Sequence, residues 1–134
     1  MANVLASLLK HSIGSKSEAN VSIQWMNEEL GFGGQLTAED IASLAAQGVK
    51  TFICNRPDGE EPGQPTRNEL EQAAEQAGST FHFLPLATGV APEESLLKNY
   101  AEVYAAAAKP VVAFCRSGRR SSVIHAGARP FMAE

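Results

Sequence analysis

Hydrophobic and polar positions along this chain follow the strand period and the helix period in turn. Residues 21–26 alternate apolar and polar side chains, which is typical of a half-buried strand, whereas residues 111–114 hold no polar side chain, which is typical of a fully buried one. The strands predicted from such runs cover residues 21–26, 30–35, 49–54, 81–86 and 111–114. The helices predicted from apolar residues at helical spacing cover residues 37–46, 66–77 and 93–108, with a short one around 123–126.

Two of the helix starts carry a capping signal. Thr37-Ala38-Glu39-Asp40 and Thr66-Arg67-Asn68-Glu69 each place a threonine three positions before an acid. Gly33 and Gly34 are interpreted as turn glycines rather than as a phosphate loop. Because helices and strands alternate along the chain, the order predicts an α/β domain with three layers, α/β/α, and a mainly parallel central sheet.

Length and composition indicate one domain with a sizeable core, since 44% of the 134 residues are hydrophobic. We place that domain at residues 21–134, after an N-terminal extension or short helix at residues 1–20. The apolar set at the start of the extension favours an amphipathic helix over a targeting peptide or a membrane span; it comprises Val4, Leu5, Leu8 and Leu9. A net charge of −4 argues against a nucleic-acid partner. Two cysteines far apart, neither in a metal-ligand spacing, predict a cytoplasmic protein without a metal or other cofactor.

The most informative stretch is the loop that begins at Cys115. The apolar run before it delivers the cysteine to the carboxyl end of a strand, where open α/β sheets place their ligands. Ser117 and Gly118 let the backbone curl, so that N–H groups ahead of the next helix form an anion nest. Three arginines add positive charge, at positions 116, 119 and 120. Together these features predict a pKa for Cys115 in the range of roughly 3.5–7.5, and therefore a thiolate.

A second candidate segment runs from Asn55 to Thr66 and holds three prolines, two glycines, three acids and one arginine. Loops of this length in compact domains are often functional, and this one leaves the same edge of the sheet as Cys115. Asp58 or Glu60 is a candidate general acid, and Arg56 is a candidate ligand for an anionic substrate. Just before the loop, Cys54 is interpreted first as a core cysteine, with a reversible disulfide to Cys115 as the alternative.

The Cys115 loop resembles the active loop of cysteine-based phosphatases and of rhodanese sulfurtransferases. In each case a strand is followed by a cysteine, a short spacer, an arginine and a hydroxyl residue, and here the spacer between Cys115 and Arg120 has four residues. Over residues 33–125 the chain resembles the phosphatase-like domain of the beta-lactamase-hydrolase-like proteins, a bacterial family. The segments that carry this resemblance are Gly34–Asp40, Gly48–Thr51, Asn55–Thr66 and the Cys115 loop. It implies a cysteine-phosphatase-like fold of the dual-specificity type and, because some members are fused to a persulfide dioxygenase, such an enzyme as a partner.

The resemblance also implies roles for residues of the loop. Cys115, Arg120 and Ser121 are the implied catalytic residues, with the Ser121 hydroxyl donating a hydrogen bond to the Cys115 sulfur. The implied substrate-binding residues are Arg116, Ser117, Gly118 and Arg119, to which the loop reasoning adds Arg56. Arg119 occupies the variable position of the motif.

Loop length favours sulfur transfer over phosphate chemistry. Phosphatases of this kind have five residues between cysteine and arginine, whereas four separate Cys115 from Arg120, and a smaller ring suits a single sulfur. Residues 87–91 also lack the aspartate that phosphatases carry in the equivalent loop. The sequence therefore predicts a rhodanese-type sulfurtransferase that moves sulfane sulfur from thiosulfate or glutathione persulfide through a Cys115 persulfide.

Two alternatives remain open. The first is a phosphatase acting on a phosphoester, in which Cys115 forms a phosphocysteine, Arg120 binds the equatorial oxygens and Asp58 protonates the leaving group. The second is a non-catalytic redox or anion-sensing module that uses Cys115 and Cys54.

Overall fold

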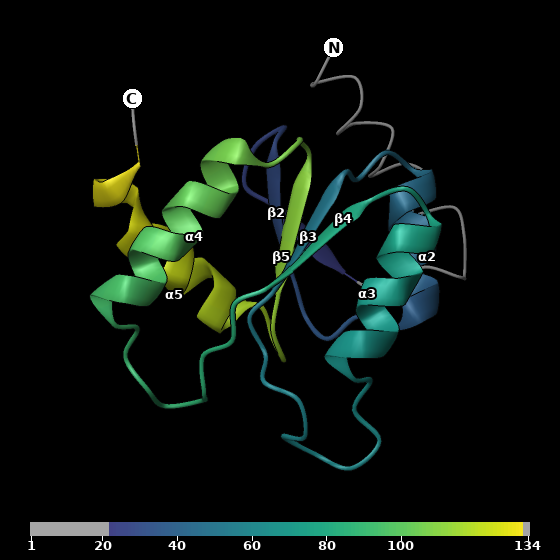
Figure 1. The fold of residues 1–134 in the computed structure, drawn as a ribbon, viewed down its shortest axis with the longest axis horizontal. Helices are drawn as coiled ribbons and strands as arrows, with labels where there is room; N and C mark the ends of the chain where they lie inside the picture. The colour runs from purple at the N-terminus through teal and green to yellow at the C-terminus, as the bar shows by residue number, and fades with distance from the viewer. Residues whose placement is uncertain (1–21, 133–134) are drawn as a thin grey trace.

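A five-stranded sheet of order β1-β2-β5-β3-β4 forms the centre of the molecule (Figure 1). The computed structural model describes residues 22–132, so the extension predicted at residues 1–20 lies outside the described residues. The strands are β1 (Ile23–Trp25), β2 (Leu30–Gly33), β3 (Thr51–Cys54), β4 (Thr80–Phe83) and β5 (Val111–Phe114). Only β1 runs antiparallel to its neighbour, and the other three pairings are parallel. The predicted α/β fold with a mainly parallel sheet is confirmed.

Two pairs of helices cover the two faces of the sheet (Figure 1). The helices are α2 (Ala38–Ala46), α3 (Arg67–Gln76), α4 (Glu94–Ala106) and α5 (Arg119–Ala128), followed by the 3₁₀ turn η1 (Arg129–Phe131). Under α2 and α3, Phe52 and Phe114 belong to one buried cluster, and under α4 and α5, Tyr100 and Ile124 belong to a second. None of the helices formed by residues 22–132 has the length and apolar character of a membrane span.

The two predicted capping boxes are present. The Thr37 hydroxyl accepts the Asp40 backbone N–H at 3.0 Å, and the Asp40 carboxylate accepts the Thr37 N–H at 2.9 Å. Thr66 and Glu69 form the same reciprocal pair at the start of α3. These bonds satisfy N–H groups that the first helical turn leaves without partners.

Helix α5 begins earlier than predicted, at Arg119 rather than near residue 123, and it has no side-chain cap. Its N-cap residue is Gly118, whose φ of +94° lies in the left-handed region that glycine adopts without steric cost. Within its first turn the Arg119 N–H donates to the Ser117 hydroxyl at 3.3 Å, whereas the N–H groups of Arg120 and Ser121 face the sulfur of Cys115.

Gly31 and Gly33 lie inside β2, which corrects the interpretation of Gly33 as a turn residue. A Cβ atom at Gly31 would come within 2.6 Å of the Ile23 side chain, and one at Gly33 within 2.8 Å of it. The glycines thus make room for the side chains of β1. Gly34 follows the strand, and a Cβ atom there would lie 3.0 Å from the carbonyl oxygen of Arg116. This close approach brings the end of β2 against the Cys115 loop.

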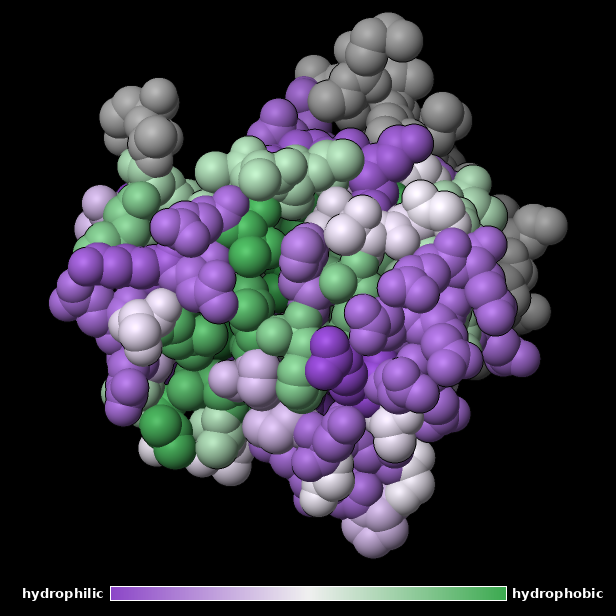
Figure 2. All heavy atoms as spheres, in the orientation of Figure 1, coloured by the Kyte–Doolittle hydropathy of each residue, from purple (hydrophilic) through white to green (hydrophobic). Residues whose placement is uncertain are grey.

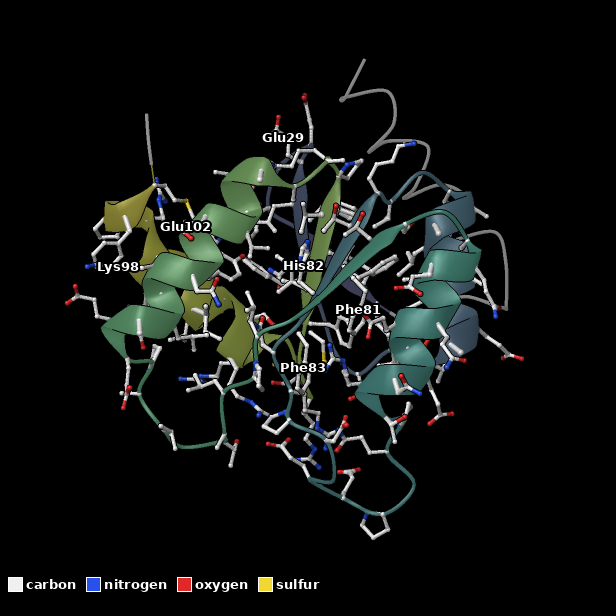
Figure 3. All side chains as sticks on the ribbon, viewed as in Figure 1. Glu29, Phe81, His82, Phe83, Lys98 and Glu102 are labelled. Carbon is white, nitrogen blue, oxygen red and sulfur yellow. The ribbon has the colours of Figure 1, made fainter. Side chains whose placement is uncertain are left out.

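The edge strand β4 sends its alternate side chains to opposite faces (Figure 3). Phe81 belongs to the core under α2 and α3, whereas His82 lines a shallow groove with Glu102 and Val103 of α4. Figure 2 shows hydrophobic side chains gathered in a band between α4 and β4 on this face. Burial lowers the pKa of His82. His82 lies away from the carboxyl edge of the sheet and takes no part in the site below.

Candidate active site

Three loops meet at the carboxyl edge of the sheet, the lower edge in Figure 1. Cys115 directly follows β5, where Phe114 is in register with Gly33 of β2 and Cys54 of β3. The Cys115 N–H donates to the Gly33 carbonyl at 3.3 Å, and the Asn55 N–H donates to the Phe114 carbonyl at 2.8 Å. The start of the Cys115 loop is therefore held on both sides by neighbouring strands.

Backbone N–H groups converge on the Cys115 sulfur. The Gly118 N–H lies 3.1 Å from Sγ, and the N–H groups of Ser117, Arg120 and Ser121 also face it. Cys115 is only 1% exposed, and this burial is the largest single influence on the pKa of its thiol, which it raises. The N–H groups together have a larger effect in the opposite direction, so the pKa of Cys115 is lowered. The shift is in the direction that the sequence predicts.

Ser121 contacts the sulfur differently from the prediction. Its hydroxyl is completely buried and has no hydrogen-bond partner among residues 22–132, so the predicted bond from that hydroxyl to Cys115 is not formed. The backbone N–H of Ser121 instead contributes to the lowered pKa of Cys115.

Arg120 is held by a bidentate ion pair with Glu60. Its Nη1 and Nη2 atoms lie 2.8 and 2.9 Å from the two carboxylate oxygens of Glu60, and Nη1 also donates to the Leu86 carbonyl at 2.8 Å. Hydrogen bonding from Arg120, with a further bond from Arg56, lowers the pKa of Glu60 to about 2. Glu60 is therefore ionised at neutral pH, which excludes the general-acid role considered for it, and it orients the arginine instead.

Arg56 lies behind the site rather than in it. Its side chain is 3% exposed, and its guanidinium donates to Glu60 at 2.8 Å, to Gln35 at 3.0 Å and to Glu61 at 3.2 Å. Such a buried, fully engaged guanidinium has no free edge for a ligand, so the contacts favour a supporting role over the direct substrate binding predicted for it. Glu61 also lies 3.5 Å from Arg116 Nε. Arg56 thus holds two glutamates, each of which contacts one arginine of the Cys115 loop.

Asp58 lies at the start of α3. Its carboxylate accepts the Arg67 N–H at 2.7 Å, and it does not line the pocket above the Cys115 loop. Its role as a general acid stays a prediction.

A pocket of about 530 Å³ opens above the loop. The Cys115 loop and the start of α5 form its polar wall, which consists of Arg116, Ser117, Arg119 and Arg120. The segment after β4 and one residue of α5 form the opposite wall, which consists of Leu86, Thr88, Gly89, Val90 and Val123. No carboxyl side chain of residues 22–132 lines it. The sequence reasoning missed Thr88, Val90 and Val123. A signal was available for Thr88 and Val90, because the segment 87–92 also follows the carboxyl end of a strand.

Cys54 is a core residue in this structure. It is a free thiol that donates to the Arg56 carbonyl at 3.4 Å, and burial raises its pKa to about 11. Its neighbours include Phe114 and the other apolar residues under α2 and α3. A thiol held protonated in this way is a poor nucleophile, which favours the core interpretation over the redox alternative.

Titration of the two cysteines is expected to separate them by pKa. We expect the thiolate absorbance of Cys115 to appear with a midpoint below the ordinary 9.0, because backbone N–H groups stabilise the anion, and that of Cys54 to appear near 11. Far-ultraviolet absorbance against pH, compared between the native protein and the variants Cys115→Ser and Cys54→Ser, assigns each transition. A Cys115 midpoint at or above 9.0 would contradict the anion nest.

Comparison with known proteins is consistent with this geometry. The family model "Beta-lactamase hydrolase-like protein, phosphatase-like domain" matches residues 22–130. A beta-lactamase hydrolase-like protein of Agrobacterium fabrum is 39% identical over 100 residues, and one of Xylella fastidiosa is 32% identical over 101 residues. Each alignment covers 75% of this chain, and the chain spans only 23% of the length of either relative.

Solved structures with the same fold are phosphatases by name. The crystal structure of a protein from Neisseria meningitidis named "putative phosphatase" matches with a TM-score of 0.71 and 36% identity, covering 85% of this chain and 78% of that one. Kinase-associated phosphatase, in a form whose catalytic-site cysteine is replaced by serine, matches with a TM-score of 0.69 and 17% identity, covering 83% and 74%. The second likeness concerns the fold alone, and it confirms the predicted cysteine-phosphatase-like architecture.

These comparisons contradict the predicted sulfurtransferase, because they favour a phosphoric monoester hydrolase. They also lend no support to a sulfur donor or a persulfide dioxygenase partner. The ring-size argument is wrong because backbone conformation, and not the number of residues alone, decides which groups reach the sulfur. With Gly118 at φ +94°, four backbone N–H groups reach the sulfur although only four residues separate Cys115 from Arg120.

Proposed function

Because the chain belongs to the family of phosphatase-like domains of beta-lactamase hydrolase-like proteins, we propose that it hydrolyses phosphoric monoesters with Cys115 as the nucleophile. The observation that carries this proposal is the Cys115 sulfur at the focus of four backbone N–H groups, with a lowered pKa. A thiolate in an anion nest is suited to attack a phosphoryl group, because the same N–H groups can bind the equatorial oxygens.

In the first step the Cys115 thiolate attacks phosphorus. An S–P bond forms, the P–O bond to the leaving group breaks, and the electron pair of that bond leaves with the oxygen. The N–H groups of the loop and the Arg120 guanidinium bind the three equatorial oxygens through the transition state. Glu60 holds the guanidinium in place through its two hydrogen bonds.

In the second step water hydrolyses the phosphocysteine. The S–P bond breaks, a P–O bond to the water oxygen forms, and the products are inorganic phosphate and the Cys115 thiolate. The low pKa of the thiolate helps this step, because a stabilised thiolate is the better leaving group.

Leaving groups of low pKa suit this pocket best. No carboxyl side chain of the described residues lines it, and Asp58 is engaged with the Arg67 N–H. A phenolate departs without full protonation, whereas an alkoxide requires a proton donor. An aryl phosphate is therefore the appropriate first substrate.

The proposal predicts a covalent phosphocysteine at position 115. We expect rapid alkaline denaturation during turnover of an aryl phosphate to yield a Cys115 peptide heavier by one phosphoryl group, detected by mass spectrometry. Cys54→Ser is the matched control and should give the same peptide, because Cys54 lies in the core. Turnover without phosphorylated Cys115, or no turnover of aryl phosphates at all, would refute the proposal.

A further inference from the structure

Three arginines line the pocket beside the Cys115 loop, although Cys115 itself is not among its lining residues. Arg120 is engaged by Glu60 and the Leu86 carbonyl, and it faces the reacting group together with the loop N–H groups. Arg116 and Arg119 line the same pocket without being needed at the sulfur.

These two arginines are exposed and form few ion pairs with the described residues. Arg119 is exposed, and its side chain forms no ion pair with any of residues 22–132. The Arg116 side chain is 70% exposed, and its one ion pair among the described residues is with the Glu61 carboxylate, at 3.5 Å. The same Glu61 oxygen also lies 3.2 Å from the Arg56 guanidinium. Like charges on one loop repel each other, and a bound anion relieves that repulsion.

We propose that the substrate carries a second anionic group, which Arg116 and Arg119 bind while the phosphoryl group lies over Cys115. This inference rests on the proposed phosphatase function. Both arginines line the pocket, and guanidinium groups pair with carboxylates and phosphates alike.

The remaining wall of the pocket indicates what joins the two anionic groups. Leu86 and the exposed side chains of Val90 and Val123 provide apolar surface, with fractional exposures of 52% for Val90 and 46% for Val123. A short carbon skeleton fits between this wall and the arginines. The substrate class is therefore a small phosphomonoester whose carbon frame bears a carboxylate or a further phosphate.

The test compares two aryl phosphates of equal shape. Para-carboxyphenyl phosphate carries the second charge, and para-carbamoylphenyl phosphate replaces that carboxylate by a neutral amide. We expect kcat/KM to be about tenfold higher for the carboxylate, with a preference that shrinks as ionic strength rises. Arg119→Gln and Arg116→Gln should each reduce the preference, whereas Arg129→Gln, an exposed arginine on η1, should leave it intact.

A binding measurement makes the inference independent of turnover. Calorimetric titration of the Cys115→Ser variant with para-carboxyphenyl phosphonate and its carbamoyl analogue should show the same preference, because neither compound can be hydrolysed. Equal affinities, or a preference that survives Arg119→Gln and Arg116→Gln together, would overturn the second anion site while leaving the phosphatase proposal intact. A preference in binding with no hydrolysis of any aryl phosphate would instead support the anion site and refute the phosphatase.

Discussion

Cys115→Ser is expected to lower kcat/KM for an aryl phosphate by about 10⁴-fold or more. A serine hydroxyl in the same N–H nest stays protonated at neutral pH, so the nucleophile is lost while the pocket keeps its shape. Initial rates on phenyl phosphate measure the effect, and circular dichroism checks that the variant is folded.

The matched control for this variant is Cys54→Ser. Cys54 is the last residue of the neighbouring strand β3 and differs from Cys115 in having a raised pKa and a place in the core. We expect it to keep kcat/KM within about threefold. Cys115→Ser activity above about 1% of the native value would show that another group attacks the substrate.

Arg120→Lys is expected to lower kcat/KM by about 10²–10³-fold. The guanidinium donates two parallel hydrogen bonds to Glu60 and one to the Leu86 carbonyl, and a lysine ammonium cannot reproduce this planar arrangement. Because the loss falls on transition-state binding, kcat should fall along with kcat/KM. A change confined to KM would show that Arg120 only attracts the substrate.

The Glu60–Arg120 pair supplies a graded control. Glu60→Gln keeps one acceptor for Arg120, so we expect kcat/KM to fall by a smaller factor, about tenfold. Glu61→Gln removes a carboxylate that contacts Arg56 and Arg116, and we expect it to lower kcat/KM by less than Glu60→Gln does. Hydrogen bonding from Arg120 lowers the pKa of Glu60 from 4.5 to about 2. The contribution of this ion pair to folding stability is therefore fully present above pH 4.5 and is lost as the pH falls through about 2. Activity above pH 4.5 should therefore show no transition from Glu60.

Local signals account for most of the fold. Thr37 and Thr66 start their helices as the capping pattern predicts, because a cap depends only on residues three positions apart. The start of α5 could not be predicted in this way. Its N-cap residue, Gly118, has no side chain to cap the helix, and the N–H groups of Arg120 and Ser121 face the sulfur of Cys115, a residue that carries no conventional capping signal.

The residues around the site divide by how far their partners lie along the chain. Convergence of N–H groups on Cys115 was predictable, because the sulfur and its donors lie within seven consecutive residues, 115–121. The roles of Arg56 and Glu60 were not. A charged loop offers several candidate partners to Arg120, and only the folded arrangement selects Glu60, which lies 60 positions away in the sequence.

The amino-acid sequence by itself determined the alternation of helices and strands, the family, and the position of Cys115 directly after a buried strand. Tertiary structure alone decided which acid orients Arg120, why Arg56 lies behind the pocket, and how a loop with four intervening residues directs its N–H groups at the Cys115 sulfur. Those outcomes depend on backbone angles at Gly118 and on contacts between segments far apart in the chain, and residue order does not specify either in advance.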